Sequence, residues 1–170
     1  MGRLTGAALL MGCGVWCGLR AAGALAGRVR DLEAWIAALG LLEGELAFSL
    51  PAVPELLESL SRKAPSPAGE TFGAALRGLD RLGVLPFEEI WSGAVRSTPG
   101  RLTPHDQETL CRLGNILGRY GWEEQREVLR ALRCELEEER SNARAEWRSK
   151  GRTHAALGFA VGTFLTILLL

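Results

Sequence analysis

The stretch VRDLEAWIAALGLLEGELAF, residues 29–48, decides the fold class of this 170-residue chain. Its larger apolar residues recur at steps of three and four, and they are Val29, Leu32, Ile36, Leu39, Leu42 and Leu46. Such steps put the side chains on one stripe of an α-helix, whereas a half-buried strand would alternate. Residues 29–48 therefore predict an amphipathic helix that buries one face against the rest of a helical domain.

Similar stripes follow along the chain, and short segments rich in proline, glycine and serine separate them. The clearest helix start lies at Thr103, because Pro104 occupies the first helical position and Asp106 stands three residues after the cap. This spacing predicts a capping box with aspartate in place of glutamate. We expect one helix from this cap to about residue 120.

The remaining helix boundaries complete the predicted fold. Residues 70–82 predict a helix that Gly83 ends. The longest helix starts near Trp122, and its dense charge after Leu136 predicts a solvated stalk with ion pairs four residues apart. The predicted fold class is all-α, an antiparallel helical bundle of about six helices over residues 28–150, with an N-terminal and a C-terminal membrane helix.

The two ends of the chain are apolar. Residues 4–19 and 155–170 carry no charged side chain. Each run comes close to the roughly 20 apolar residues that a spanning helix needs. We therefore expect residues 1–27 to form a membrane anchor or signal-anchor, and residues 151–170 to form a C-terminal membrane helix.

A cleaved N-terminus is the alternative to a retained anchor. Leu10-Met11-Gly12-Cys13 is similar to a lipoprotein processing site, with a small residue before the cysteine. Lipidation of Cys13 would make the chain an extracytoplasmic structural protein of the cell envelope. Apolar sequence continues past Cys13, however, and this continuation favours the anchor.

Positive charge flanks the inner ends of both apolar segments. The flanking residues are Arg20, Arg28, Arg30, Arg144, Arg148, Lys150 and Arg152. Only Arg3 precedes the first segment, and no charged residue follows the second. Because segments rich in Lys and Arg stay cytoplasmic, we expect a cytoplasmic middle domain with both spans entering the membrane from it.

Small residues within the two apolar segments suggest helix packing in the membrane. Gly158 and Gly162 form a small-xxx-small pattern, which is common where membrane helices approach closely, and chance is the alternative. Cys13 and Cys17 are also four residues apart and share a helix face. These four residues are the candidate membrane-helix packing positions.

No catalytic, metal or cofactor site is predicted. The four cysteines form no CxxC pair, and the two histidines lie far from any close pair of cysteines. No phosphate loop or nucleophile elbow occurs, and solvated helix faces explain the carboxylate pairs. A membrane-bound hydrolase would need a cleft lined by carboxylates with shifted pKa values. The formal net charge is zero, so bulk charge does not favour nucleic acid.

Three tryptophans and one glutamine are candidates for a partner surface. Trp35, Trp91 and Trp122 are considered because aromatic residues often anchor interfaces, and a place in the core is the alternative for each. Gln125 lies among apolar residues near the start of the longest helix. Its amide either hydrogen-bonds across the bundle or is exposed.

Three motifs and the order of the parts resemble the stage III sporulation protein AB family of endospore-forming bacteria, over nearly the whole chain. The first motif is Leu42-Glu43-x-Glu45-Leu46 leading to Ser49-Leu-Pro-x-x-Pro-Glu-Leu-Leu. The second is Leu102-Thr103-x-x-Asp106 followed by Leu110-x-x-Leu113-Gly114-x-x-Leu117-Gly118. The third is Glu124-Gln125, then Lys150-Gly151 before Leu-Gly-Phe-Ala-Val-Gly.

The resemblance implies a membrane component of the complex between mother cell and forespore. The implied location is the cell membrane, on the mother-cell side of the outer forespore membrane. The soluble domain is similar to the helical cytoplasmic domains of F-type inner-membrane proteins of type II secretion. Other stage III sporulation complex proteins, including an ATPase, are the implied partners. No catalytic residue and no cofactor is implied.

Overall fold

The computed structural model describes the backbone of residues 2–48, 51–117 and 122–169, and side chains within residues 23–149 except 49–50 and 118–124. This part of the chain forms helices and no strand, apart from one isolated bridge between Leu82 and Leu85. The all-α prediction is confirmed for it. Contacts divide the chain into two units, residues 28–141 and the two ends, 1–27 with 142–170.

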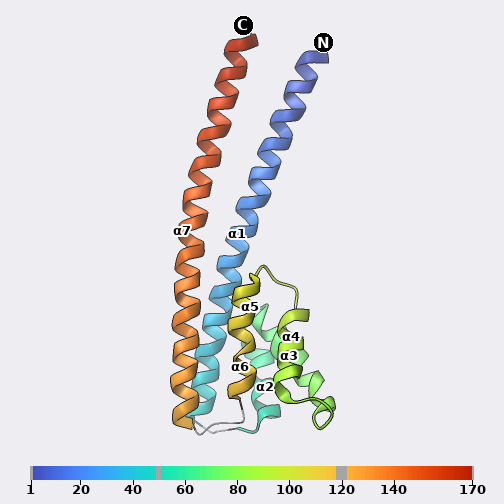
Figure 1. The fold of residues 1–170 in the computed structure, drawn as a ribbon, viewed down its shortest axis with the longest axis vertical. Coiled ribbons are helices and arrows are strands. Elements are labelled where there is room, and N and C mark those ends of the chain that lie inside the picture. Colours follow the sequence, from blue (N-terminus) through green and yellow to red (C-terminus); the bar gives the residue numbers. More distant parts are fainter. Residues whose placement is uncertain (1, 49–50, 118–121, 170) are drawn as a thin grey trace. The chain divides into compact units, whose positions relative to one another are not determined.

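The helices follow one another with short connections (Figure 1). In chain order they are α1 (Gly2–Phe48), α2 (Val53–Lys63), α3 (Ala68–Gly78), the 3-10 helix η1 (Leu79–Arg81), α4 (Phe87–Ser97), α5 (Pro104–Cys111), α6 (Leu113–Ile116) and α7 (Trp122–Leu169). Helix α1 has no break between the N-terminal apolar segment and the amphipathic stretch.

Within residues 28–141, α1 is the central helix. Its predicted stripe is buried, and so is Trp35. The Trp35 ring contacts Phe72 of α3 and Trp91 of α4, with ring centroids 5.8 and 6.2 Å apart. Phe72 and Trp91 also contact each other at 5.3 Å. This aromatic cluster joins three helices at the centre of the core, where such rings contribute most through the area they bury.

Ion pairs show that α1 and α7 are antiparallel within residues 28–141. Arg28 of α1 pairs with Glu139 of α7, and Glu43 of α1 pairs with Arg133 of α7. Residue numbers that rise along α1 thus meet residue numbers that fall along α7, as in an antiparallel hairpin. The charged part of α7 is therefore only partly a solvated stalk. An i,i+4 ion pair joins Arg133 to Glu137 at its start, and the pairs expected beyond Leu136 stay a prediction.

The predicted capping box at the start of α5 is confirmed. The Thr103 hydroxyl accepts a hydrogen bond from the Asp106 backbone N–H, and the Asp106 carboxylate accepts one from the Thr103 N–H at 2.8 Å. Both donors would otherwise be unpaired at a helix start.

The single helix predicted from residue 104 to about 120 is wrong, because the structure divides it into α5 and α6 at Arg112. The indole Nε1 of Trp91 donates to the Leu110 carbonyl at 2.8 Å. In an unbroken α-helix that carbonyl would accept from the N–H of Gly114. Gly114 also lies against the Trp91 ring, so close that a Cβ there would sit 2.8 Å from its Cδ1. A long-range contact thus overrides local helix propensity.

The helix predicted over residues 70–82 also ends earlier than expected. Regular α3 stops at Gly78, and η1 continues the chain to Arg81. Gly83 then adopts a φ of 108°, which only glycine accepts without strain. The backbone reverses here, because Val84 and Leu85 donate their N–H groups to the Arg81 carbonyl.

The two expected membrane helices fall on residues whose side chains lie outside the described part of the structure. Their backbone belongs to α1 and α7. Among the residues that are described, no helix has a stretch long and apolar enough to cross a membrane.

Candidate functional site

A buried ion-pair network joins α1, α5 and α7. The Arg28 guanidinium donates to both oxygens of Asp106, from Nε at 2.9 Å and from Nη2 at 2.8 Å. Nη2 also donates to Glu139 Oε2 at 2.7 Å. The Asp106 side chain is 0% exposed, and its Oδ2 also accepts the N–H of Thr103. One carboxylate therefore both caps α5 and holds it against α1.

Charge and hydrogen bonding keep this network ionised. Burial raises the pKa of Asp106, but hydrogen bonds from Arg28 and Thr103 and the Arg28 charge outweigh it, so the pKa lies below its ordinary value. The hydrogen bond with Asp106 raises the pKa of Arg28 above its ordinary value against the opposing effect of burial. The network is thus a structural clamp between three helices.

Sequence reasoning missed this network. Arg28 was interpreted as a membrane-flanking charge and Glu139 as a solvated residue, and only the cap role of Asp106 was predicted. Arg28 is 78 residues from Asp106 and 111 from Glu139. The one available signal was an arginine at a helical position next to the buried stripe, which does not identify its partner.

Two other carboxylates have lowered pKa values, and both belong to helix contacts. Hydrogen bonds from Lys63 and Ser59 lower the pKa of Glu45. Burial raises the pKa of Glu135, but hydrogen bonds from Thr109 and Arg112 lower it below the ordinary value. Each shift therefore has a structural partner as its cause.

The described residues contain no group of three or more His, Cys, Asp or Glu side chains arranged to hold a metal ion. The described cysteines, Cys111 and Cys134, are free thiols.

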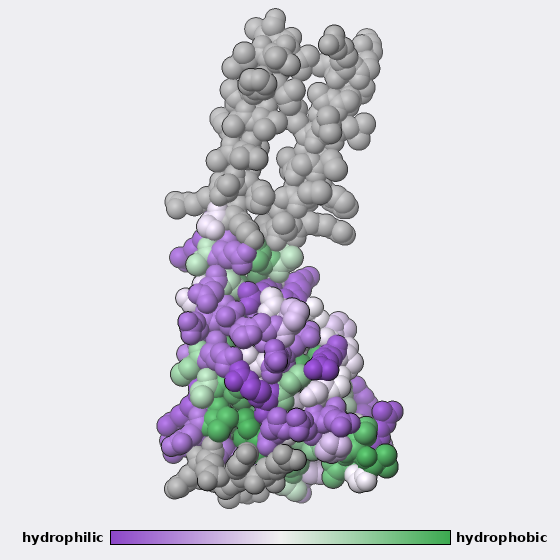
Figure 2. Space-filling view, viewed as in Figure 1, coloured by the Kyte–Doolittle hydropathy of each residue, from purple (hydrophilic) through white to green (hydrophobic). Residues whose placement is uncertain are grey.

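An apolar turn projects from the domain between η1 and α4. Leu82 is 58% exposed and Val84 is 88% exposed, on either side of Gly83. Figure 2 shows hydrophilic residues over much of the coloured face and hydrophobic residues gathered over this turn, at the lower right. We call residues 82–84 the apolar turn.

A shallow groove of about 380 Å³ adjoins the apolar turn. It is lined chiefly by Val53, Pro54, Leu79, Leu82, Phe87 and Leu117. These residues come from α2, η1, α4 and the end of α6, so the groove is a concave continuation of the turn. Exposed apolar surface of this kind is typical of a protein contact.

The four candidates for a partner surface have different positions. Trp35 and Trp91 are buried in the aromatic cluster, so the core alternative holds for both and neither forms an accessible surface. Gln125 is also buried, and its Nε2 donates to the Ile116 carbonyl at 3.3 Å, so the amide bonds across the bundle. The Trp122 side chain lies outside the described residues.

The other sequence candidates also lie outside the described side chains. Cys13 and Cys17 belong to the N-terminal stretch of α1, and Gly158 and Gly162 to the C-terminal stretch of α7. Their helix-packing role, and lipidation of Cys13, stay predictions. Sequence reasoning did not find the apolar turn, because a helix pattern does not show that Leu82 and Val84 are exposed.

Comparisons with known proteins agree on one family. The family profile described as stage III sporulation protein AB matches residues 3–170. A solved structure of stage III sporulation protein AB (SpoIIIAB) superimposes with a TM-score of 0.61 at 20% identity. The match covers 72% of this chain and 97% of that chain, and at this identity it shows likeness of fold. No match was found among curated proteins. Because the profile spans nearly the whole sequence, the chain belongs to the stage III sporulation protein AB family.

Proposed function

We propose that this protein is a non-enzymatic, membrane-anchored structural or adaptor subunit of a sporulation-associated, secretion-like complex between mother cell and forespore. Its helical domain engages other proteins of that complex, an ATPase or channel components. Family membership supports the link to sporulation. The lowered pKa values of Asp106, Glu45 and Glu135 support a non-enzymatic role, because structural contacts explain each of them.

The apolar turn is the observation that carries the adaptor role. Val84 is 88% exposed, and the adjoining groove extends the same apolar surface. Burying apolar surface stabilises a complex by about 25 cal/mol per Å² before the costs of association. The occupant we propose is an apolar segment of another subunit of the complex, which would cover the turn and enter the groove.

Anchoring in the membrane is part of the proposal. Residues 4–19 and 155–170 carry no charge, and apart from Arg3 the Lys and Arg residues that flank them lie at their inner ends. We propose that both ends span the cell membrane on the mother-cell side of the outer forespore membrane, with the helical domain cytoplasmic. In these spans Gly158, Gly162, Cys13 and Cys17 would line the faces where helices pack.

Complementation of a sporulating strain that lacks the protein tests the adaptor role. Val84→Asp places a charge in the apolar turn, and Phe48→Asp places the same charge on another apolar side chain, which is 94% exposed at the end of α1. We expect Val84→Asp to lose heat-resistant spores and Phe48→Asp to keep them, at equal protein levels. Full sporulation with Val84→Asp would contradict the proposed surface.

The orientation needs a separate experiment. A reporter active on only one side of the membrane is inserted between Ser97 and Arg101, and mass spectrometry determines whether Cys13 is lipidated. A cytoplasmic reporter with unmodified Cys13 supports the anchor. An external reporter with a lipidated Cys13 would instead establish the alternative, an extracytoplasmic lipoprotein.

A further inference from the structure

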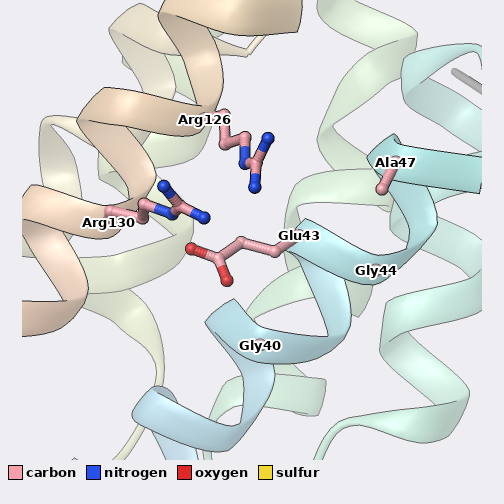
Figure 3. Close-up of a pocket in the computed structure, with 6 residues that line it drawn as sticks. All are labelled: Gly40, Glu43, Gly44, Ala47, Arg126 and Arg130. Atoms are coloured by element: carbon pink, nitrogen blue, oxygen red, sulfur yellow. The ribbon is translucent and has the colours of Figure 1, made fainter.

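A cleft between α1 and α7 has a different chemistry from the apolar turn. Within residues 28–141, Gly40, Gly44 and Ala47 of α1 face Arg126 and Arg130 of α7, and Glu43 lies between them. In Figure 3 the two guanidinium groups and the Glu43 carboxylate point toward one another. The space measures about 400 Å³, enough for one or two side chains of a partner. We call it the arginine cleft.

The lining of this cleft holds two arginines and one glutamate, so its formal charge is positive. Both Arg126 and Arg130 are exposed, and within the described residues neither has an ion pair. Glu43 is engaged by a third arginine, because its Oε2 lies 3.5 Å from Arg133 Nη1. Like charges four residues apart destabilise a helix by about 0.2–0.5 kcal/mol, so Arg126 and Arg130 repel each other along α7.

The floor of the cleft is kept open by glycine. A Cβ at Gly44 would meet nothing within 4 Å, and one at Gly40 would meet only an Arg133 nitrogen, at 3.8 Å. Neither glycine is required by close packing, and glycine in a helix interior costs about 1 kcal/mol relative to alanine. Their effect is to leave room for an incoming group beside the two arginines.

We propose that the arginine cleft binds an acidic segment of a partner protein, with a carboxylate seated on Arg126 and Arg130. Arginine binds carboxylates through paired hydrogen bonds, which gives orientation as well as affinity. This contact adds a second surface to the proposed function, but its test does not require sporulation.

Two observations favour a peptide carboxylate over a polyanion. Glu43 places a negative charge inside the cleft and its Oε1 accepts no hydrogen bond from a described residue, so several closely spaced phosphates would meet more repulsion there than a single carboxylate. Gly40 also lies 12 residues beyond Arg28 on α1, about 18 Å along the helix at 1.5 Å per residue. Lipid headgroups at the end of the proposed membrane segment would not reach the cleft.

The test measures binding of a fluorescein-labelled peptide of alternating Glu and Ala to the full chain in non-ionic detergent. We expect fluorescence anisotropy to show binding that weakens with salt. The double variant Arg126→Ala with Arg130→Ala should weaken binding at least about tenfold. The matched control, Arg77→Ala with Arg96→Ala, removes two other exposed arginines and should change it less than twofold.

A steric variant separates the cleft from diffuse charge. Gly44→Leu fills the floor of the cleft without changing its charge. We expect this variant to weaken peptide binding as much as the double arginine variant does. Absence of peptide binding, or equal binding by the arginine variants and wild type, would overturn the proposal. So would unchanged binding by Gly44→Leu, or stronger binding to anionic vesicles or duplex DNA than to the peptide.

Discussion

Replacing Asp106 with asparagine should lower the free energy of unfolding of the helical domain by about 3 kcal/mol, the lower end for breaking a buried ion pair. The carboxylate is 0% exposed and accepts three hydrogen bonds, two from Arg28 and one from the Thr103 N–H. The asparagine oxygen can keep the bonds at Oδ2. Its amide nitrogen would then face Arg28 Nη2, a second donor, at a distance that now holds a hydrogen bond.

Two comparison variants divide that effect into its parts. Asp106→Ala removes the capping box as well, so we expect a further loss of about 1 kcal/mol. Glu139→Gln removes the outer partner of Arg28. Because the Glu139 side chain is 24% exposed, this variant should lower the free energy of unfolding by at most about 1 kcal/mol. From most to least stable, the expected order is wild type, Glu139→Gln, Asp106→Asn and Asp106→Ala.

The assay is urea unfolding of the full chain in non-ionic detergent, followed by tryptophan fluorescence. Trp35 and Trp91 are buried in the core, so their emission changes when the domain unfolds. A free energy of unfolding for Asp106→Asn that differs from wild type by less than about 0.5 kcal/mol would refute the clamp, because surface substitutions fall within that range.

Three further predictions concern the same domain. The lowered pKa of Asp106 means that its stabilisation is complete above pH about 4 and is lost as pH falls, so unfolding of wild type and Asp106→Asn should converge below that pH. In urea unfolding, Trp91→Phe should lower the free energy of unfolding by about 1–3 kcal/mol more than Trp35→Phe, because the Trp91 indole donates a hydrogen bond and the Trp35 indole has no partner among the described residues. Equal losses for the two variants would contradict this. Gly114→Ala should lower the free energy of unfolding by about 1–3 kcal/mol because the new methyl group crowds the Trp91 ring. Gly44→Ala should raise it by up to about 1 kcal/mol, and calorimetry shows whether each variant is destabilised or stabilised.

Much of the fold follows from local sequence. The stripe through Leu32, Leu39 and Leu46 predicts the buried face of α1, because helical periodicity is a local property. The capping box of Thr103 and Asp106 is predicted for the same reason, since its donors and acceptors lie three residues apart.

The features that sequence analysis missed depend on contacts between distant residues. The break between α5 and α6 follows from the Trp91 indole reaching Leu110, and no pattern near residue 112 indicates it. The clamp joins Arg28 to residues 78 and 111 positions away. Exposure of the apolar turn and the opening of the arginine cleft likewise depend on how helices pack, which one sequence does not show.

Site-specific photocrosslinking in sporulating cells tests the adaptor role most directly. A photoreactive amino acid replaces Val84 in the apolar turn, or Phe48 as the exposed control, and crosslinked products are identified by mass spectrometry. We expect the residue-84 probe to crosslink to an ATPase or another stage III sporulation protein, and the residue-48 probe not to. If the residue-84 probe crosslinks to none of these proteins while protein levels and sporulation are normal, the result would contradict a role for this surface in the complex.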